Sequence, residues 1–267
     1  MATQLESIVA YHRDLAARDT RRLASVMKDA DRVPDPPSLL DALVRSGTEP
    51  LRLIAEVKRR SPSAGALATE LDPAALAAAY ERGGAAAISV LTDGPHFGGS
   101  PADVRAVRDA STLPILRKDF TVSGLDIADA RLMGASAVLL IVAALSRREL
   151  RSFLEVADAL GLTSLVEVHN ARELEIALEL GALVIGVNQR DLATFAIDPQ
   201  RAAALAASFP SDVVSVAESG IGDVATARQC AALGYDAVLV GEALVRSADP
   251  EATVAAFCAP VDEGASA

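Results

Sequence analysis

Five charged residues suited to acid–base chemistry and one amide that could orient a substrate stand where short apolar segments end. They are Glu56, Lys58, Lys118, Glu167, Asn188 and Glu218. Ammonium and carboxylate groups that share one pocket shift one another's pKa, and general acid–base catalysis depends on such shifts. A single charged residue at such a position is usually solvated or forms a weak surface ion pair. Convergence of all six residues on one place would instead indicate an acid–base active site.

Two glycines near the end of the chain indicate a site for a phosphate group. Gly220 follows Ser219 at the end of one apolar segment, and Gly241 precedes Glu242 in the next. Glycine allows backbone N–H groups to approach an anion closely, and such groups at a helix start bind phosphate. The segment 58–70, which carries Ser61, is long for a connection between a strand and a helix, and we predict that it closes over the same anion as a lid.

The apolar segments that would position these groups alternate with stretches of helical period. The segments are 51–57, 85–92, 113–120, 137–145, 162–169, 183–190, 213–220 and 237–244. Near-continuous hydrophobicity is typical of parallel strands that are buried on both faces. Helix-capping residues stand between the segments, at Asp72, Ser100, Ser146 and Asn170.

Eight strand–helix units predict an α/β protein with a single (β/α)8 TIM barrel, in which the active site lies at the carboxyl ends of the strands. A doubly wound open sheet is the alternative fold, but the glycine-rich phosphate motifs that often accompany it, GxGxxG and GxxxxGK[ST], do not occur in the sequence. We therefore expect a barrel over residues 51–258, preceded by a helical extension over 1–50 and followed by a flexible tail over 259–267. The extension is expected to form one helix around Ile8 and a second, short helix within 33–47. It could cap the bottom of the barrel or lie over its mouth.

Composition limits the partners that this protein can have. The chain of 267 residues has 25 basic and 36 acidic residues, a formal net charge of −11, which argues against binding to nucleic acid or to an anionic membrane surface. Cys230 and Cys258 cannot form a disulfide scaffold, and the three histidines share no metal-ligand spacing, so no metal site is predicted. The longest apolar run, 137–145, is shorter than the ~20 residues of a spanning helix. These features, and an N-terminus unlike a signal peptide, predict a cytoplasmic protein.

Several of these segments, taken together, resemble the indole-3-glycerol phosphate synthase family. The motifs are IAEVKRRSPSAG (54–65), PILRKDF (114–120), LVEVHN (165–170), IGVNQRDLATF (185–195), VAESGI (216–221) and VLVGEALVRSADP (238–250). The resemblance implies a lyase of tryptophan biosynthesis, a carboxy-lyase that uses no cofactor and acts on a phosphorylated, anthranilate-derived small molecule. Its reaction closes the ring of 1-(2-carboxyphenylamino)-1-deoxyribulose 5-phosphate, with loss of carbon dioxide and water. We expect a monomer, with a weak homodimer as the alternative.

The resemblance also implies a role for each site residue. Lys118 corresponds to the general acid and Glu167 to the general base, while Lys58 holds anionic groups of the substrate and shares acid duties with Lys118 in a division that the sequence leaves open. The remaining residues bind or orient the substrate. Those near its polar groups are Glu56, Asn188, Glu218, Ser219, Arg190, Ser61, Gly220, Gly241 and Glu242, and those of the apolar slot for the aromatic ring are Phe97, Phe120, Leu139, Leu192 and Val240.

Two other functions are compatible with the residues. One is another phosphate-binding barrel enzyme, either an isomerase or an aldolase that forms a Schiff base on Lys118 or Lys58. The other is a barrel subunit without catalytic activity. A subunit of that kind would be expected to lose some of the six strand-end groups, all of which are present.

Overall fold

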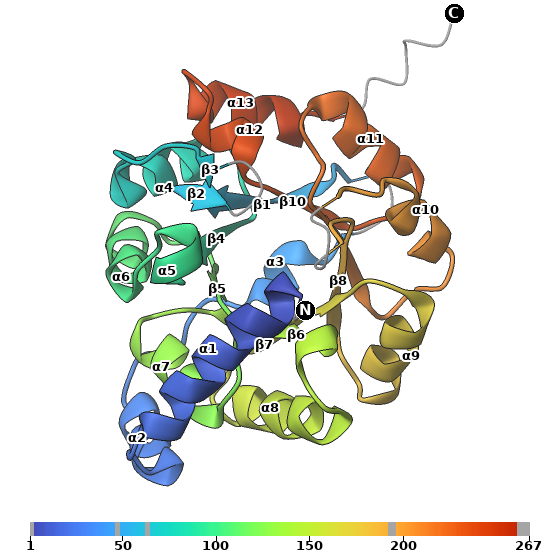
Figure 1. Cartoon of the computed structure of the whole chain (residues 1–267). Helices are drawn as coiled ribbons and strands as arrows, with labels where there is room; N and C mark the ends of the chain where they lie inside the picture. Colours follow the sequence, from blue (N-terminus) through green and yellow to red (C-terminus); the bar gives the residue numbers. More distant parts are fainter. Residues whose placement is uncertain (1–2, 46–48, 62–64, 192–195, 261–267) are drawn as a thin grey trace, which may run out of the picture.

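Eight parallel strands close into a barrel in this computed structural model, which describes residues 3–45, 49–61, 65–191 and 196–260 (Figure 1). Neighbouring strands pair in the order β1-β10-β9-β8-β7-β6-β5-β4, and β4 pairs with β1 to complete the ring. The predicted (β/α)8 barrel is therefore confirmed. The strands of the barrel are β1 (Arg52–Val57), β4 (Ala87–Leu91), β5 (Ile115–Lys118), β6 (Ala137–Ile141), β7 (Thr163–Val168), β8 (Val184–Asn188), β9 (Val214–Glu218) and β10 (Ala237–Val240).

Helices surround the barrel and connect its strands (Figure 1). Their predicted capping residues are confirmed, since the side chains of Asp72, Ser100, Ser146 and Asn170 each accept a backbone N–H from the first turn. The helices that follow the strands are α4 (Pro73–Arg82), α5 (Gly94–Phe97), α6 (Pro101–Ala110), α7 (Gly124–Leu132), η1 (Val142–Ala144, a 3-10 turn), α8 (Arg147–Ala159), α9 (Ala171–Glu179), α10 (Gln200–Ala206), α11 (Val224–Ala232), α12 (Glu242–Val245) and α13 (Pro250–Cys258).

All eight predicted strand segments are longer than the strands that form, and two of them run on into a helical turn. The segment 137–145 forms β6 only as far as Ile141 and continues as η1, and the segment 237–244 forms β10 only as far as Val240 and continues as α12. Apolar residues carry on past the strand in both places because Val142, Leu145 and Leu244 of the following segment are buried as well, so hydrophobicity alone does not mark the strand end.

Alternation along each strand divides the apolar residues between two cores. On β1, Ile54 belongs to the core inside the barrel, whereas Leu53 and Ala55 belong to the larger core between the strands and the helices. Because side chains alternate along a strand, Glu56 shares the inward face with Ile54. Inward positions near the start of the strands are apolar, and those near the carboxyl ends carry the polar groups of the candidate site.

The N-terminal extension contacts both ends of the barrel. Helix α1 (Gln4–Arg18) lies over the mouth, where Leu5 and Ile8 line a pocket, and α3 (Leu39–Leu43) buries its two terminal leucines in the inner core. Helix α2 (Leu23–Ala30), which the sequence analysis did not predict, packs against α7. The two positions considered for the extension are thus both occupied, by different helices (Figure 1).

The segment predicted as a lid contains a small hairpin. Strand β2 (Arg60–Ser61) pairs in antiparallel fashion with β3 (Gly65–Ala66), and residues 62–64 between them lie outside the described part of the chain. At the other end, the described chain stops at residue 260, two residues into the predicted tail. No described helix is long and apolar enough to cross a membrane.

We predict that Leu39→Ala lowers the free energy of unfolding by about 2–5 kcal/mol, because it opens a cavity at the end of the barrel that α3 closes. Leu39 is fully buried, with side chains of the inner core around it. Leu183→Ala is the matched control, since Leu183 is 52% exposed and should change stability by less than about 0.5 kcal/mol. Urea unfolding measures both variants, and equal effects would contradict the role assigned to α3.

Candidate active site

A cavity of about 450 Å³ opens at the carboxyl ends of the barrel strands. Most of the site residues predicted from the sequence line it together, although they come from eight different segments. They are Glu56, Lys58, Ser61, Phe97, Lys118, Phe120, Leu139, Glu167, Asn188, Arg190, Glu218, Ser219, Gly220, Gly241 and Glu242. The structure thus brings the five acid–base candidates and Asn188 into one pocket.

Of the residues expected in the apolar slot, one is placed elsewhere and another lies outside the described part of the chain. Val240 belongs to the core between strands and helices, so its assignment to the pocket is wrong. Its neighbours Leu239 and Gly241 line the pocket, because alternation on β10 turns these two positions inward and Val240 outward. Leu192 lies outside the described residues.

The ammonium of Lys118 occupies the centre of the charged groups. Its Nζ atom lies 3.4 Å from Glu218 Oε2 and 3.6 Å from Glu167 Oε2. Burial disfavours the ammonium, but Glu218, Glu167 and Glu56 outweigh that effect and raise the pKa of Lys118 above its ordinary value. Lys118 is therefore charged at neutral pH, a state suited to donating a proton or a strong hydrogen bond.

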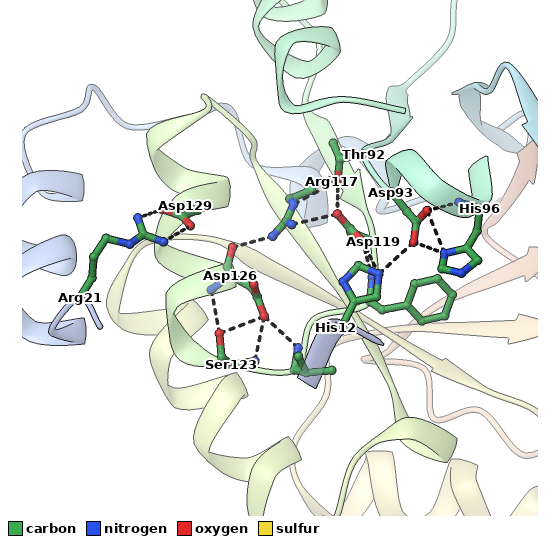
Figure 2. A network of polar contacts seen from close by, with 12 residues as sticks. His12, Arg21, Thr92, Asp93, His96, Arg117, Asp119, Ser123, Asp126 and Asp129 are labelled. Atoms are coloured by element: carbon green, nitrogen blue, oxygen red, sulfur yellow. Dashed lines mark hydrogen bonds and ion pairs between the residues drawn. The ribbon is translucent and has the colours of Figure 1, made fainter. Parts of the chain in front are cut away.

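Asp119, the neighbour of Lys118, has a separate set of partners. Its carboxylate accepts hydrogen bonds from Thr92 Oγ1, from Arg117 Nη2 at 2.9 Å and from the backbone N–H of Phe120 (Figure 2). Arg117 is the ion-pair partner of Asp119, and both residues are buried. Lys118 is consequently left to the carboxylates of the pocket.

Glu167 is held as a carboxylate between Lys118 and His169. The Nε2 atom of His169 lies 3.4 Å from Glu167 Oε1, and its Nδ1 atom lies 3.1 Å from Glu173 Oε2. Burial would raise the pKa of Glu167, but Lys118, followed by His169 and Asn188, lowers it to about 2. Burial also works against a charged His169, yet Glu167 and Glu173 raise the pKa of this imidazole to about 9. The sequence analysis assigned no role to His169.

Glu218 differs from the other carboxylates of the pocket because Lys118, which Glu167 also contacts, is its one ion-pair partner among the described residues. Both of its carboxylate oxygens are buried, and neither has a hydrogen-bond partner among the described residues. Burial, together with the nearby Glu167 and Glu56, raises the pKa of Glu218 to about 7 in spite of Lys118. Glu218 is thus positioned to exchange a proton near neutral pH, or to accept a hydrogen bond from a bound molecule.

A glycine on the neighbouring strand makes room for Glu218. A Cβ atom at Gly186 would lie 1.9 Å from Glu218 Oε1, so even an alanine would displace the carboxylate. Gly186 faces inward on β8, between Val184 and Asn188. Sequence reasoning overlooked this residue, although a glycine inside an otherwise β-branched strand signals a close approach.

Glu56 and Lys58 form a second ion pair on the β1 side of the pocket. The Nζ atom of Lys58 lies 2.5 Å from Glu56 Oε1, so the two residues neutralise each other in the absence of substrate. Burial would raise the pKa of Glu56, but Lys58 and then Lys118 lower it. A Cβ atom at Gly241 would lie 2.5 Å from Glu56 Oε1 and 3.0 Å from Lys58 Nζ. This glycine therefore keeps the pair close to the start of α12.

The end of β9 has an unusual backbone conformation. Among the described residues, Ser219 is the one non-glycine residue with a positive φ (66°). Gly220 (φ 74°) follows it in the same conformational region. The Gln189 side chain donates a 2.8 Å hydrogen bond to the Ser219 carbonyl. Such strain persists at functional sites when neighbouring groups fix it. Ser219, Gly220 and Gly222 line the pocket here, as a backbone cradle for an anion would require.

Apolar side chains form the wall opposite these glycines. The ring centroids of Phe97 and Phe120 are 6.3 Å apart, and both residues line the cavity with Leu139. Leu5 and Ile8 of α1 complete this wall, and the sequence analysis did not identify either of them. No local pattern identifies these two residues, because their contribution depends on where α1 packs.

A histidine cluster lies beside the pocket, where the sequence predicted no metal-ligand arrangement. His12 Nε2 and His96 Nδ1 each lie 2.8 Å from Asp93 Oδ2, and Figure 2 shows both imidazole rings directed at this carboxylate. The histidines share no metal-ligand spacing along the sequence, and the fold nevertheless brings two of them to one carboxylate. Eighty-one residues separate His12 from Asp93, so only the packing of α1 on the barrel brings them together.

The chain matches the model of a known family over almost its whole length. Residues 5–257 match the family described as indole-3-glycerol phosphate synthase. A protein of that name from Micrococcus luteus is 52% identical over 238 residues, which are 88% of each chain. Another from Mycolicibacterium vanbaalenii is 50% identical over 256 residues, 95% of this chain and 93% of the relative.

Solved structures with low sequence identity share the fold. A 3-hexulose-6-phosphate synthase superimposes with a TM-score of 0.62 at 17% identity, covering 79% of this chain and 100% of the other. A thiamine phosphate pyrophosphorylase from Pyrococcus furiosus gives a TM-score of 0.59 at 18% identity, covering 78% and 93% of the two chains. These similarities concern the barrel and carry no information about the reaction.

We predict that His169→Gln flattens the dependence of stability on pH between 6.5 and 9. The folded protein raises the pKa of His169, so its protonation stabilises the fold below pH 6.5, and this contribution is lost as pH rises through about 9. The variant should lose less unfolding free energy than the wild type across this range, by about 1–3 kcal/mol.

Urea unfolding at several pH values measures the difference, with Glu218→Gln as the control for the other group that titrates in this range. An identical slope for His169→Gln and the wild type would show that His169 gains nothing from its two carboxylate partners.

Proposed function

Because the chain belongs to the indole-3-glycerol phosphate synthase family, it makes indole-3-glycerol phosphate, and we propose that the pocket at the barrel mouth performs each step of this synthesis. The substrate is 1-(2-carboxyphenylamino)-1-deoxyribulose 5-phosphate, and the reaction closes a ring, releases carbon dioxide and then releases water. Loss of carbon dioxide makes the enzyme a carboxy-lyase. The observation that carries this proposal is the convergence of two lysines, three glutamates and an asparagine on one cavity.

Lys118 is the general acid of ring closure. Attack of the aromatic carbon on the substrate ketone generates an alkoxide, and this oxygen needs a proton or a strong hydrogen bond as it forms. The Lys118 ammonium is buried among Glu167 and Glu218, which keep it charged before the substrate arrives. The same partners disfavour the neutral amine that a Schiff-base aldolase would need, and this argues against that alternative.

Glu167 is the general base of the dehydration step. It is ionised in the free enzyme and lies across Lys118 from Glu218, so an acid and two carboxylates face the same volume. Release of water from the cyclised intermediate requires removal of a proton from carbon and protonation of the leaving hydroxyl. Glu167 accepts the first proton, and Lys58 or Lys118 supplies the second. His169 positions the Glu167 carboxylate from the opposite side.

The remaining polar residues hold the substrate in place. When the substrate binds, the Lys58 ammonium contacts an anionic group of the substrate and weakens its ion pair with Glu56. The Glu56 carboxylate then orients the anilino nitrogen. Asn188 and Glu218, which are paired across β8 and β9, lie next to the hydroxyl groups of the sugar chain. Arg190, at the pocket rim, assists in binding the substrate.

The phosphate binds where the ends of β9 and β10 meet. Ser219, Gly220, Gly241 and Glu242 line this end of the pocket, and Ser61, in the segment that follows the neighbouring strand β1, lines the pocket as well. The anthranilate ring occupies the wall of Phe97, Phe120 and Leu139, to which Leu5 and Ile8 now add. Decarboxylation is favoured there because an apolar wall desolvates the departing carboxylate, while the nitrogen of the cyclised intermediate accepts the electrons.

Two further properties belong to this proposal. We place the enzyme in the cytoplasm, because a substrate that carries both a phosphate and a carboxylate does not cross a lipid bilayer unaided. We also expect a monomer, with a weak homodimer as the alternative, and sedimentation velocity distinguishes the two.

Indole-type fluorescence tests the proposed reaction directly. The chain has no tryptophan and three tyrosines, so the product is detected against a low background when substrate is added to the purified protein. We expect a steady rise in metal-free buffer with EDTA, since no step uses a metal. A folded protein that binds inorganic phosphate but gives no signal would contradict the proposed activity.

We predict that Lys118→Met lowers kcat by about 10²–10⁴-fold, the usual contribution of a general acid. Lys28→Met is the matched control, because Lys28 is an exposed lysine on α2 and should keep wild-type kcat. Circular dichroism establishes that both variants are folded. More than about a tenth of wild-type kcat in Lys118→Met would rule out the general-acid role.

We predict that Glu167→Gln lowers kcat by about 10²-fold or more while KM stays near its wild-type value, because the amide cannot accept the proton. Glu175→Gln on the exposed face of α9 is the control. A variant that binds substrate weakly but turns it over at the wild-type rate would assign Glu167 to binding instead of catalysis.

A further inference from the structure

We propose that His12, Asp93 and His96 form a binding site for one divalent transition-metal ion of the zinc class, next to the substrate pocket and separate from it. The three candidate ligand atoms all lie within 4.8 Å of one another. None of the three residues lines the substrate cavity. The site combines His12 of α1, Asp93 at the N-cap of α5 and His96 within α5, and the proposed reaction uses none of them.

The two imidazole rings already converge on one carboxylate oxygen. His12 Nε2 and His96 Nδ1 both lie 2.8 Å from the same oxygen, Asp93 Oδ2. Tetrahedral zinc with bonds of about 2.0–2.2 Å separates its ligands by roughly 3.3 Å, so a small outward movement of the two rings admits the ion. The backbone N–H of His96 donates a 2.7 Å hydrogen bond to Asp93 Oδ1, which orients Oδ2 toward the cluster. Such an outer contact is typical of metal-binding carboxylates.

The donor set selects the class of metal. Two imidazoles and one carboxylate suit Zn²⁺, Co²⁺ or Ni²⁺, whereas Mg²⁺ and Ca²⁺ prefer oxygen ligands throughout. Each neutral ring binds the ion through the nitrogen that faces Asp93 and keeps its proton on the other nitrogen, so acid competes with the metal. The His96 side chain is 26% exposed and the His12 side chain 14%, which leaves a path from solvent.

The fourth ligand of the ion would be a water molecule. The nearest other carboxylate atom is Asp119 Oδ1, 3.8 Å from His12 Nε2. That carboxylate already accepts hydrogen bonds from Arg117, Thr92 and the backbone of Phe120, so moving it toward the metal would leave buried donors unpaired. A site with three protein ligands and one water is an ordinary arrangement for zinc.

A metal at this position would fasten α1 to the barrel mouth. His12 lies one turn beyond Ile8, which lines the substrate pocket, and its ring packs against Phe120 at a centroid distance of 5.4 Å. His96 lies on α5, which ends at Phe97 of the same apolar wall. The ion would therefore restrain two sides of the slot without touching the substrate.

Titration of the untagged, EDTA-treated chain with Co²⁺ tests the proposal, because four-coordinate Co²⁺ has strong visible absorption bands. We expect one Co²⁺ per chain with such bands, and loss of the bands on addition of Zn²⁺. His12→Gln and His96→Gln should each weaken binding by at least about tenfold, since glutamine can still donate to Asp93 but is a poor ligand. The same metal should raise the thermal midpoint of the wild type and not of these variants.

His169→Gln is the matched control, because it removes the remaining histidine and leaves the cluster intact. It should bind Co²⁺ as the wild type does. The proposal is overturned if the wild type shows no four-coordinate spectrum, if the two cluster variants bind as tightly as the wild type, or if a sulfur-to-cobalt charge-transfer band shows that a cysteine is the ligand.

Discussion

The charged pocket depends on one buried ammonium group. Removing Lys118 from water costs several kcal/mol, and the carboxylates around it must repay that cost. Glu218 and Glu167 contact it, and Glu56 acts from slightly farther away. These three come from β9, β7 and β1, so a closed barrel is needed to assemble them around one lysine of β5. A single charge therefore requires a particular arrangement of half the strands.

The three carboxylates around Lys118 differ in whether they have a second cationic partner: Glu56 and Glu167 each have one, and Glu218 has none among the described residues. Glu56 has Lys58, and Glu167 has His169, so both remain ionised when the pocket is empty. Glu218 has only Lys118, which does not outweigh burial and the nearby Glu167 and Glu56, so the pKa of Glu218 rises to about 7. Two like charges close together in a buried site do not ionise equally. Glu218 is consequently the carboxylate whose protonation responds most readily when an anionic substrate enters, because the added negative charge favours its neutral form.

Much of this arrangement could be predicted from the sequence, because a strand imposes a strict alternation. The polar strand-end residues share the parity of inward apolar residues such as Ile54 and Leu116, and all of them converge. The same rule, applied to β10, places Leu239 in the pocket and Val240 outside it. The sequence thus contained the information needed to exclude Val240, which was assigned to the pocket because it is apolar. The role of α1 is different. Leu5, Ile8 and His12 reach the mouth through tertiary packing across long sequence separations, and no local period encodes such a contact.

The acidity of the chain makes the outer surface unfavourable for anions but does not prevent the pocket from binding one. Exposed charges are screened by salt over about 8 Å, whereas Lys58 and Lys118 lie in a partly dehydrated cavity where their fields are weakened much less. Backbone N–H groups at Gly220 and Gly241 add positive potential without changing the net charge. A net charge of −11 is therefore compatible with a substrate that carries two anionic groups, a phosphate and a carboxylate, provided that these groups reach the few local donors. The strand ends and glycine positions, more than the composition, determine what this protein binds.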